Sequence, residues 1–187
     1  ESLPKFPEMR ITKVYTRTGD DGTTGLANGK RVPKDSKRVR LFGSLDELNA
    51  SIGVALVENL NKDITSVLQD VQNDLFNIGG EVSVVDKELG LITTEDVQKL
   101  ENAIDSLNET LAPLEEFVVP GGSKGSALLH KARTVCRRAE CDLVNLSHEE
   151  KINMIHLQYL NRFSDYLFVA ARYQNNIDGS SEETWEK

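Results

Sequence analysis

The chain has 187 residues, of which 39% are hydrophobic and 28% are charged, as is usual for a single globular domain. Its 22 lysines and arginines are outnumbered by 30 aspartates and glutamates, and the net charge of −8 argues against nucleic-acid binding. No apolar run is long enough to span a bilayer, so we expect no membrane association. A small anionic ligand stays compatible with this balance, because a local group of arginines matters more to it than the total charge.

The N-terminal segment is predicted to lack long helices and strands. We expect residues 1–11 to form a flexible extension and residues 10–34 to be irregular. Five residues that interrupt regular structure occur in the second range: Gly19, Gly22, Gly25, Gly29 and Pro33.

Apolar residues then recur at helical spacing and predict five helices. The expected ranges are about 35–59, 62–84, 94–112, 123–146 and 152–177. Ser36 (or Asp35) and Ser123 are expected to cap the first and fourth helices, and Thr94 the third. An alternative start for the first helix is a capping box formed by Ser44 and Glu47.

Short connections and the lack of an alternating strand pattern predict an all-α five-helix bundle, a single domain over residues 12–177 preceded by the N-terminal loop. Residues 178–187 are expected to be a polar, loose tail. Cys136 and Cys141 lie five residues apart in one predicted helix and point away from each other, which argues against a disulfide or a zinc pair. Reduced thiols favour a cytoplasmic protein.

The run Thr16–Gly25 is rich in threonine and glycine. Glycines allow backbone N–H groups to converge on an anion, and threonine hydroxyls add donors, so the run is compatible with phosphate binding. It is not a Walker motif, because no Gly-Lys-Ser/Thr follows Gly25. Taken alone, the segment is more typical of a hydrophilic hairpin turn at Asp20–Gly22. Lys34 is either a further phosphate contact or a solvated surface lysine.

A group of arginines marks the fourth predicted helix. Arg133 and Arg137 are four residues apart and lie on one face, with Glu140 near it, whereas Arg138 points elsewhere, beside Cys141. The alternative is a charged outer face whose ion pairs are worth only about 0.3–0.5 kcal/mol each. Apolar flanking residues leave a narrow polar strip, which favours a carboxylate or phosphate partner, since a stranded buried charge costs about 3–5 kcal/mol.

Candidate partners occur on two other helices. Asp46 shares a face with the small residues Gly43, Ala50 and Gly53, where another helix can approach closely, so an ion pair with Arg133 or Arg137 is expected. Asn161 is either a hydrogen-bonding group for a base or ribose, or a helix-surface amide. The three histidines, His130, His148 and His156, lack metal-ligand spacing, and we predict no protein metal site.

Five motifs in the same order resemble the PduO-type ATP:cob(I)alamin adenosyltransferases and cover residues 12–175. They are Thr16-Arg17-Thr18-Gly19-Asp20-Asp21-Gly22, Ser44-Leu45-Asp46-Glu47-Leu48-Asn49, Phe117-Val118-Val119-Pro120-Gly121-Gly122, Ala132-Arg133-Thr134-Val135-Cys136-Arg137-Arg138-Ala139-Glu140 and Leu160-Asn161-Arg162-Phe163-Ser164-Asp165-Tyr166. The resemblance implies a homotrimer with ATP between neighbouring subunits. It also implies transfer of the 5′-deoxyadenosyl group of ATP to cob(I)alamin, with Mg²⁺ assisting and triphosphate leaving. A cobalamin reductase and an adenosylcobalamin-dependent enzyme are the implied protein partners.

The resemblance also implies roles for individual residues. Arg137 would stabilise the leaving triphosphate, Asp46 would pair with Arg133 across a subunit interface, and Phe117 and Asp165 would contact cobalamin, with Phe117 helping to displace its lower axial base. The implied ATP-binding residues are Thr16, Arg17, Thr18, Gly19, Thr24, Gly25, Lys34, Arg137, Arg138, Glu140, Cys141 and Asn161. Two positions depart from the family pattern: Cys141 replaces a residue that is often basic, and Thr24-Gly25 stands where hydroxyls are common. The alternatives are a carrier of adenosylcobalamin with little turnover and a purely structural helical bundle.

Overall fold

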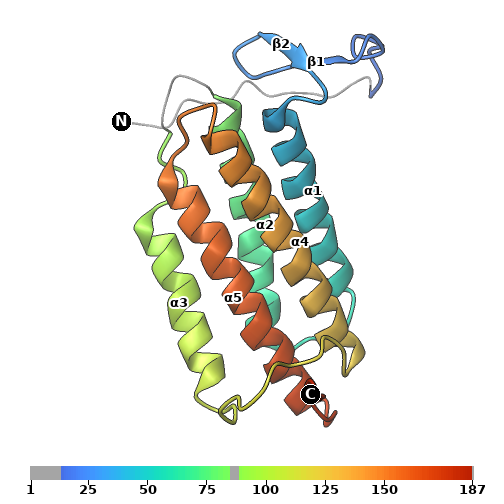
Figure 1. The fold of residues 1–187 in the computed structure, drawn as a ribbon, viewed down its shortest axis with the longest axis vertical. Coiled ribbons are helices and arrows are strands. Elements are labelled where there is room, and N and C mark those ends of the chain that lie inside the picture. The colour runs from blue at the N-terminus through green and yellow to red at the C-terminus, as the bar shows by residue number, and fades with distance from the viewer. Residues whose placement is uncertain (1–13, 85–88, 187) are drawn as a thin grey trace.

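The computed structural model describes residues 14–84 and 89–186. Five long helices lie side by side along the long axis of the molecule, and a small hairpin stands beyond the end where the first helix begins (Figure 1). The elements are β1 (Thr23–Gly25), β2 (Arg31–Pro33), α1 (Lys37–Leu56), α2 (Lys62–Ser83), α3 (Thr94–Asn108), α4 (Lys124–Ser147) and α5 (Met154–Ile177). The predicted five-helix bundle is confirmed.

The helix starts follow local capping chemistry. Ser36 accepts a hydrogen bond from the Val39 N–H at 3.4 Å, and Ser123 accepts one from Ser126 at 3.3 Å, so both predicted caps are confirmed. The expected cap of α3 was one residue late, because Thr93 donates its N–H to the Asp96 carboxylate at 2.9 Å.

The alternative capping box at Ser44 is wrong. Ser44 lies inside α1, is buried, and donates its hydroxyl to Asp142 of α4. A tertiary contact therefore explains this serine.

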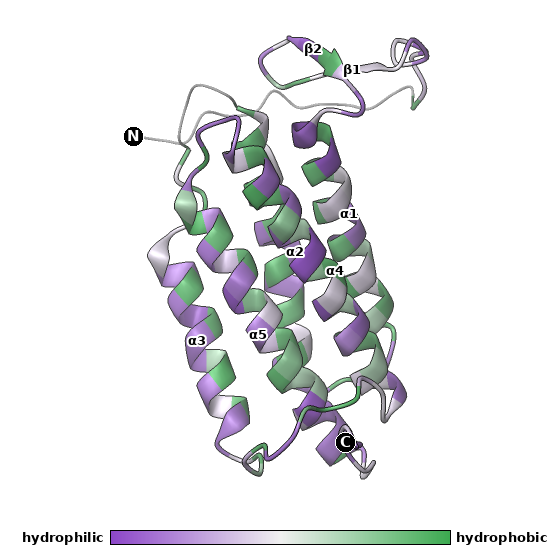
Figure 2. Ribbon diagram, in the orientation of Figure 1, coloured by the Kyte–Doolittle hydropathy of each residue, from purple (hydrophilic) through white to green (hydrophobic). Residues whose placement is uncertain are grey.

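The core consists of the inward faces of the helices. α4 packs against both α5 and α1, while α3 packs on α5 and α2 on α1. Each helix carries hydrophilic and hydrophobic residues on different sides, as Figure 2 shows. The predicted stripe of α2 is confirmed, because Ile64, Leu68 and Ile78 are all fully buried. No helix in the described residues is both long and apolar enough to cross a bilayer.

The N-terminal segment contains more regular structure than expected. β1 and β2 form an antiparallel two-stranded sheet in which Thr24 pairs with Val32. The connecting turn lies at residues 26–30, where Leu26 N–H donates to the Lys30 carbonyl at 2.8 Å and Gly29 has a φ of 79°. A separate turn closes between Gly22 N–H and the Gly19 carbonyl at 3.2 Å. The prediction that this segment lacks long elements is confirmed, but its description as irregular was wrong for this short sheet. The predicted extension at residues 1–11 lies outside the described residues.

The C-terminal tail is also more ordered than expected. Its Trp185 N–H donates to the Phe117 carbonyl at 2.8 Å, and the Glu183 carbonyl accepts from Val119 N–H at 2.8 Å. These bonds place the tail beside the segment between α3 and α4, at the end of the bundle opposite the hairpin (Figure 1). The prediction of a loose tail was wrong for these residues, because their pairing partner lies far away in the sequence.

Candidate functional site

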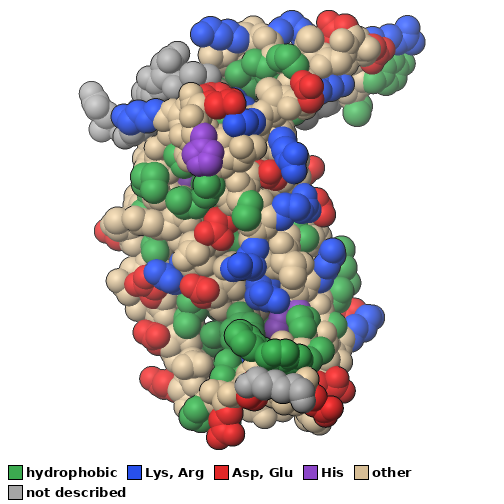
Figure 3. All heavy atoms as spheres, viewed as in Figure 1, with side chains coloured by type: hydrophobic (Ala, Val, Ile, Leu, Met, Phe, Trp, Pro, Cys, Tyr) green, Lys and Arg blue, Asp and Glu red, His purple; other side chains and the backbone are tan. Residues whose placement is uncertain are grey.

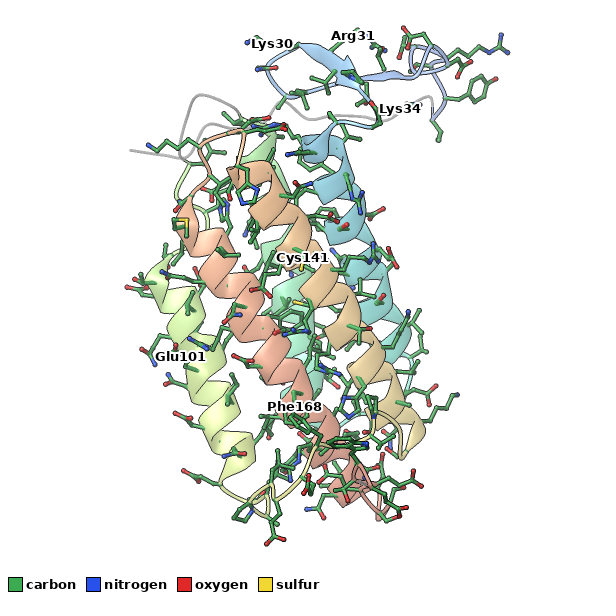
Figure 4. The ribbon with its side chains drawn as sticks, viewed as in Figure 1. Lys30, Arg31, Lys34, Glu101, Cys141 and Phe168 are labelled. Atoms are coloured by element: carbon green, nitrogen blue, oxygen red, sulfur yellow. The ribbon has the colours of Figure 1, made fainter. Side chains whose placement is uncertain are left out.

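Arg31 organises the N-terminal loop, and sequence reasoning missed it. Its guanidinium donates to the Thr18 carbonyl, to the Thr23 hydroxyl at 2.9 Å and to the Thr23 carbonyl at 3.2 Å. Thr16 and Thr18 share a hydroxyl hydrogen bond of 2.8 Å. No local sequence signal pointed to Arg31, because its partners Thr18 and Thr23 are brought to it only by the pairing of β1 with β2. Figure 4 shows Lys30, Arg31 and Lys34 together on this hairpin.

The same loop places a lysine ammonium against its own backbone. A Cβ built on Gly19 would lie 3.1 Å from Lys34 Nζ, so the absence of a side chain at Gly19 gives the ammonium room. Lys34 N–H in turn donates to the Gly22 carbonyl at 2.9 Å. Arg17 adopts a left-handed φ of 64°, which is uncommon outside glycine and asparagine. Glycines, hydroxyls and cations thus meet in one exposed loop, as an anion site requires.

The arginine face of α4 is partly buried at Arg133 and exposed at Arg137 and Arg138. Arg133 is half-buried, and its guanidinium lies 5.9 Å from the centre of the Phe168 ring of α5. Its Nε is buried and has no hydrogen-bond partner in the described part of the chain. Burial, and then the charge of the nearby Arg137, lower the pKa of Arg133. Arg137 itself is exposed, and Figure 3 shows basic side chains gathered over α1 and α4.

Asn161 of α5 joins this face. Its amide donates to Glu140 at 3.0 Å, so two of the predicted nucleotide contacts from different helices meet. Arg138 instead forms an ion pair with Glu47 of α1, in keeping with its predicted separate direction, and Cys141 is exposed on α4 (Figure 4). The loop lies beyond the end of the bundle (Figure 1), and the Asn161 amide bonds to Glu140 of α4 and not to the loop.

Cys136 is buried and Cys141 is exposed, and both are free thiols, so the expectation of no disulfide between them is confirmed. The Cys136 thiol lies 3.3 Å from the Leu160 carbonyl. Burial raises the pKa of the Cys136 thiol, which keeps it protonated and unreactive.

Asp46 does not meet the arginines within one chain. It is exposed on α1 and lines a groove of about 320 Å³ between α1 and α2, together with Phe42 and Phe76. Neighbouring Gly43 and Ala50 are exposed too, whereas Gly53 on the same face is half-buried against Gln72 of α2. The part of the face around Asp46 is therefore uncovered in the described chain. The expected Asp46–Arg133 or Asp46–Arg137 pair is therefore absent from the single described chain, and a pair across an interface stays a prediction.

The two expected cobalamin contacts lie in different surroundings. Phe117 is 77% exposed, and its ring centre is 6.4 Å from that of Trp185. Asp165 is exposed on α5 and accepts a hydrogen bond from Arg162 at 3.1 Å. Arg162 also pairs with Glu101 of α3 at 2.9 Å, so Asp165 belongs to a network that links two helices.

The buried histidines have structural surroundings. His130 lies under the segment that carries Phe117, and burial, followed by the charge of Arg133, lowers its pKa to about 4. His156 forms a buried pair with Glu81 of α2. Within residues 14–84 and 89–186, no group of three histidine, cysteine, aspartate or glutamate side chains is placed to hold a metal ion.

Comparisons with known proteins converge on one family. A family model described as "Cobalamin adenosyltransferase" matches residues 14–174. The chain is 45% identical over 179 residues to a cobalamin adenosyltransferase of Cupriavidus metallidurans, covering 95% of this chain and 96% of that one. It is 44% identical to a corrinoid adenosyltransferase of Bacillus subtilis, covering 94% and 93%.

A solved structure agrees with these matches. A variant of the PduO-type ATP:corrinoid adenosyltransferase from Lactobacillus reuteri, complexed with cobalamin and ATP, superposes with a TM-score of 0.89 at 31% identity. The match covers 94% of this chain and 100% of that chain.

Proposed function

The chain belongs to the cobalamin adenosyltransferase family, and we propose that it transfers the 5′-deoxyadenosyl group of ATP to cob(I)alamin. The products are adenosylcobalamin and triphosphate. The observation that carries this conclusion is that the family match spans both the N-terminal loop and the α4–α5 face. The chain is thus an ATP:corrinoid adenosyltransferase.

The chemistry requires charge stabilisation rather than a protein nucleophile. The cobalt of cob(I)alamin attacks C5′ of ATP with its own electron pair. A cobalt–carbon bond forms, the bond from C5′ to the phosphate oxygen breaks, and triphosphate leaves with those electrons. Negative charge therefore grows on the leaving group, where positive side chains such as Arg137 and Lys34 lower the barrier.

We propose that the loop holds the phosphates of ATP through Thr16–Gly19, Thr24, Gly25 and Lys34. Arg137, Arg138, Glu140, Cys141 and Asn161 would line the rest of the nucleotide site. The loop supplies backbone and hydroxyl donors beside an ammonium, and α4 supplies guanidinium groups, which together match a polyphosphate.

A homotrimer with ATP between neighbouring subunits explains why these two halves do not meet in one chain. The support is physical: Asp46 lies between the exposed small residues Gly43 and Ala50, and Phe76 beside it is 73% exposed. Arg133 has a buried Nε with no partner in the described chain. We propose that Asp46 of one subunit pairs with Arg133 of the next and orders the site.

Mg²⁺ fits this site as a companion of ATP. The ion prefers one or two carboxylates together with phosphate oxygens. Glu140, a half-buried carboxylate beside Asn161, belongs to the proposed nucleotide site. Mg²⁺ would therefore be held mainly by the phosphate oxygens of ATP and by water. When bound, Mg²⁺ adds positive charge to the triphosphate. We also propose a cytoplasmic location, because ATP is available there and the two cysteines would stay reduced.

Cobalamin is proposed to bind at the exposed Phe117, with Asp165 as a second contact. Phe117 is an aromatic side chain that is 77% exposed to water, and contact with a flat corrin would bury its apolar surface. Phe117 on the lower face of the corrin would occupy the place of the axial base. Loss of that base makes the cobalt easier to reduce before it attacks ATP.

The first experiment mixes the purified protein with ATP, Mg²⁺ and chemically reduced cob(I)alamin, and follows cob(I) absorbance together with triphosphate. We expect adenosylcobalamin and triphosphate in a one-to-one ratio. Binding of both substrates without product would reject the transferase and favour the carrier. Binding of neither, with no thermal shift on adding ATP, would leave only a structural bundle.

A further inference from the structure

The last described residues of the chain lie against the segment that carries Phe117. Trp185 N–H donates to the Phe117 carbonyl at 2.8 Å, and Val119 N–H donates to the Glu183 carbonyl at 2.8 Å. Val118 and Thr184 form an antiparallel bridge between these two bonds. Residues 180–185, which we call the C-terminal strap, therefore fix the backbone on both sides of Val118.

Two buried side chains of α5 hold the strap in place. Arg172 is 6% exposed and binds both carboxylate oxygens of Glu182, at 2.8 and 3.1 Å, which is the fork geometry of a strong ion pair. Arg172 also donates to the Ala112 carbonyl at 3.0 Å. One guanidinium thus connects the strap, α5 and the start of the segment that leads to Phe117.

Asn175 makes the second attachment. It is 3% exposed, and its amide donates to the carbonyls of Ser180 and Ser181, at 3.1 Å each. Its oxygen accepts from the Ser123 N–H at 2.8 Å, at the start of α4. A side chain at Gly122 would collide with this amide, so the glycine is needed for the close approach. One buried asparagine thus joins the end of α5, the strap that follows it and the distant start of α4.

The Phe117 side chain itself depends on the strap. It is 77% exposed, and the Trp185 ring, tilted by 56° at a centroid distance of 6.4 Å, is its aromatic neighbour among the described residues. Trp185 therefore contacts both the backbone and the ring of Phe117. Figure 3 shows hydrophobic side chains gathered at this end of the molecule.

From these contacts we infer that the C-terminal strap positions Phe117 for the corrin, with Trp185 as the positioning residue. The inference rests on the proposed function, in which Phe117 replaces the lower axial base of cobalamin. An exposed phenylalanine samples several side-chain orientations, and a neighbouring ring restricts them before the ligand arrives. Trp185 then affects cobalamin through Phe117, and ATP not at all.

The test compares Trp185→Ala, which removes the ring but keeps the backbone N–H, with Trp185→Phe, which keeps a ring. The readouts are kcat/KM for each substrate, the absorbance of base-off cob(II)alamin bound with ATP, and the Tm. We expect Trp185→Ala to lower the base-off fraction and kcat/KM for cobalamin by about 3- to 10-fold, the effect of one aromatic pair. KM for ATP and the Tm stay unchanged, and Trp185→Phe recovers most of the loss. Met154→Ala, an exposed residue at the other end of α5, is the matched control.

A double-mutant cycle with Phe117→Ala identifies the route of the effect. If Trp185 acts through Phe117, Trp185→Ala causes no further loss once Phe117 is alanine. Additive losses, an unchanged base-off spectrum in Trp185→Ala, or an equal loss for ATP and cobalamin would each overturn the inference. Failure of the unmodified protein to convert cob(I)alamin would instead overturn the proposed function, and the positioning role with it.

Discussion

The N-terminal loop and the α4 face, both proposed to bind the triphosphate of ATP, obtain their shapes from different interactions. The loop depends on solvent-exposed hydrogen bonds: the Arg31 guanidinium donates to Thr23, and the Lys34 N–H donates to the Gly22 carbonyl. Each such bond contributes only about 0.5–1.5 kcal/mol net. The α4 face is carried by a helix whose other side is buried against α1 and α5. A change in the loop should therefore weaken ligand binding alone, whereas a change on α4 should affect catalysis, assembly or folding.

The largest expected effect is on the α4 side. Arg137→Ala should lower kcat by about 100- to 1000-fold, the usual cost of removing one donor to a developing negative charge. Arg137 is exposed, so the Tm and cobalamin binding should be kept. Single-turnover kinetics with cob(I)alamin measure the effect, and Lys131→Ala on the same helix is the control. A wild-type rate in Arg137→Ala would remove its catalytic role.

Assembly provides the next test. Asp46→Asn should leave Arg133 without its charged partner and weaken self-association by about 2 kcal/mol or more, roughly 30-fold. Sedimentation velocity over a range of concentrations measures this, together with ATP titration. Asp70→Asn, an exposed carboxylate on α2, is the control. Unchanged association and unchanged ATP affinity would exclude the Asp46–Arg133 pair.

His130 on α4 should make the folding stability of the bundle depend on pH, an effect in which the loop takes no part. His130 has its pKa lowered to about 4 by burial, while an unfolded histidine titrates near 6.5. Between these values the unfolded state takes up a proton that the folded state refuses. Stability is therefore full above pH 6.5 and falls, by at most about 1.4 kcal/mol per pH unit, as the pH decreases towards 4.

Urea unfolding of His130→Gln at pH 7, 5.5 and 4.5 checks this linkage. The variant should lose less stability on acidification than the unmodified protein, whereas His148→Gln, at an exposed position, should behave like the unmodified protein. Identical pH dependence in all three proteins would contradict the buried neutral state of His130.

The smallest effect is expected in the loop. Arg31→Ala removes the guanidinium bonds to Thr18 and Thr23 and should raise KM for ATP by about 3- to 10-fold, the value of one or two polar bonds. The bundle does not rest on the hairpin, so the Tm should stay within a degree or so of the unmodified value. Lys30→Ala, the preceding cation, is the control. A large fall in Tm would show that loop and bundle are not separable.

Local sequence patterns determined the helices and the candidate residues. Apolar spacing and the caps Ser36 and Ser123 act within a few residues, so the five helices could be predicted nearly to their ends. The arginine spacing on α4 placed Arg133 and Arg137 on one face for the same reason. The family motifs identified the chemistry, because the types and order of their residues are visible without coordinates.

The tertiary structure alone decided the contacts between distant segments. Trp185 pairs with Phe117 and Arg172 with Glu182 through geometry that the folded bundle creates, and no local period encodes such partners. It also showed that Asp46 and Arg133 remain apart in one chain. Helices arise from neighbours three and four residues apart, whereas straps and subunit contacts require the packed bundle to exist first.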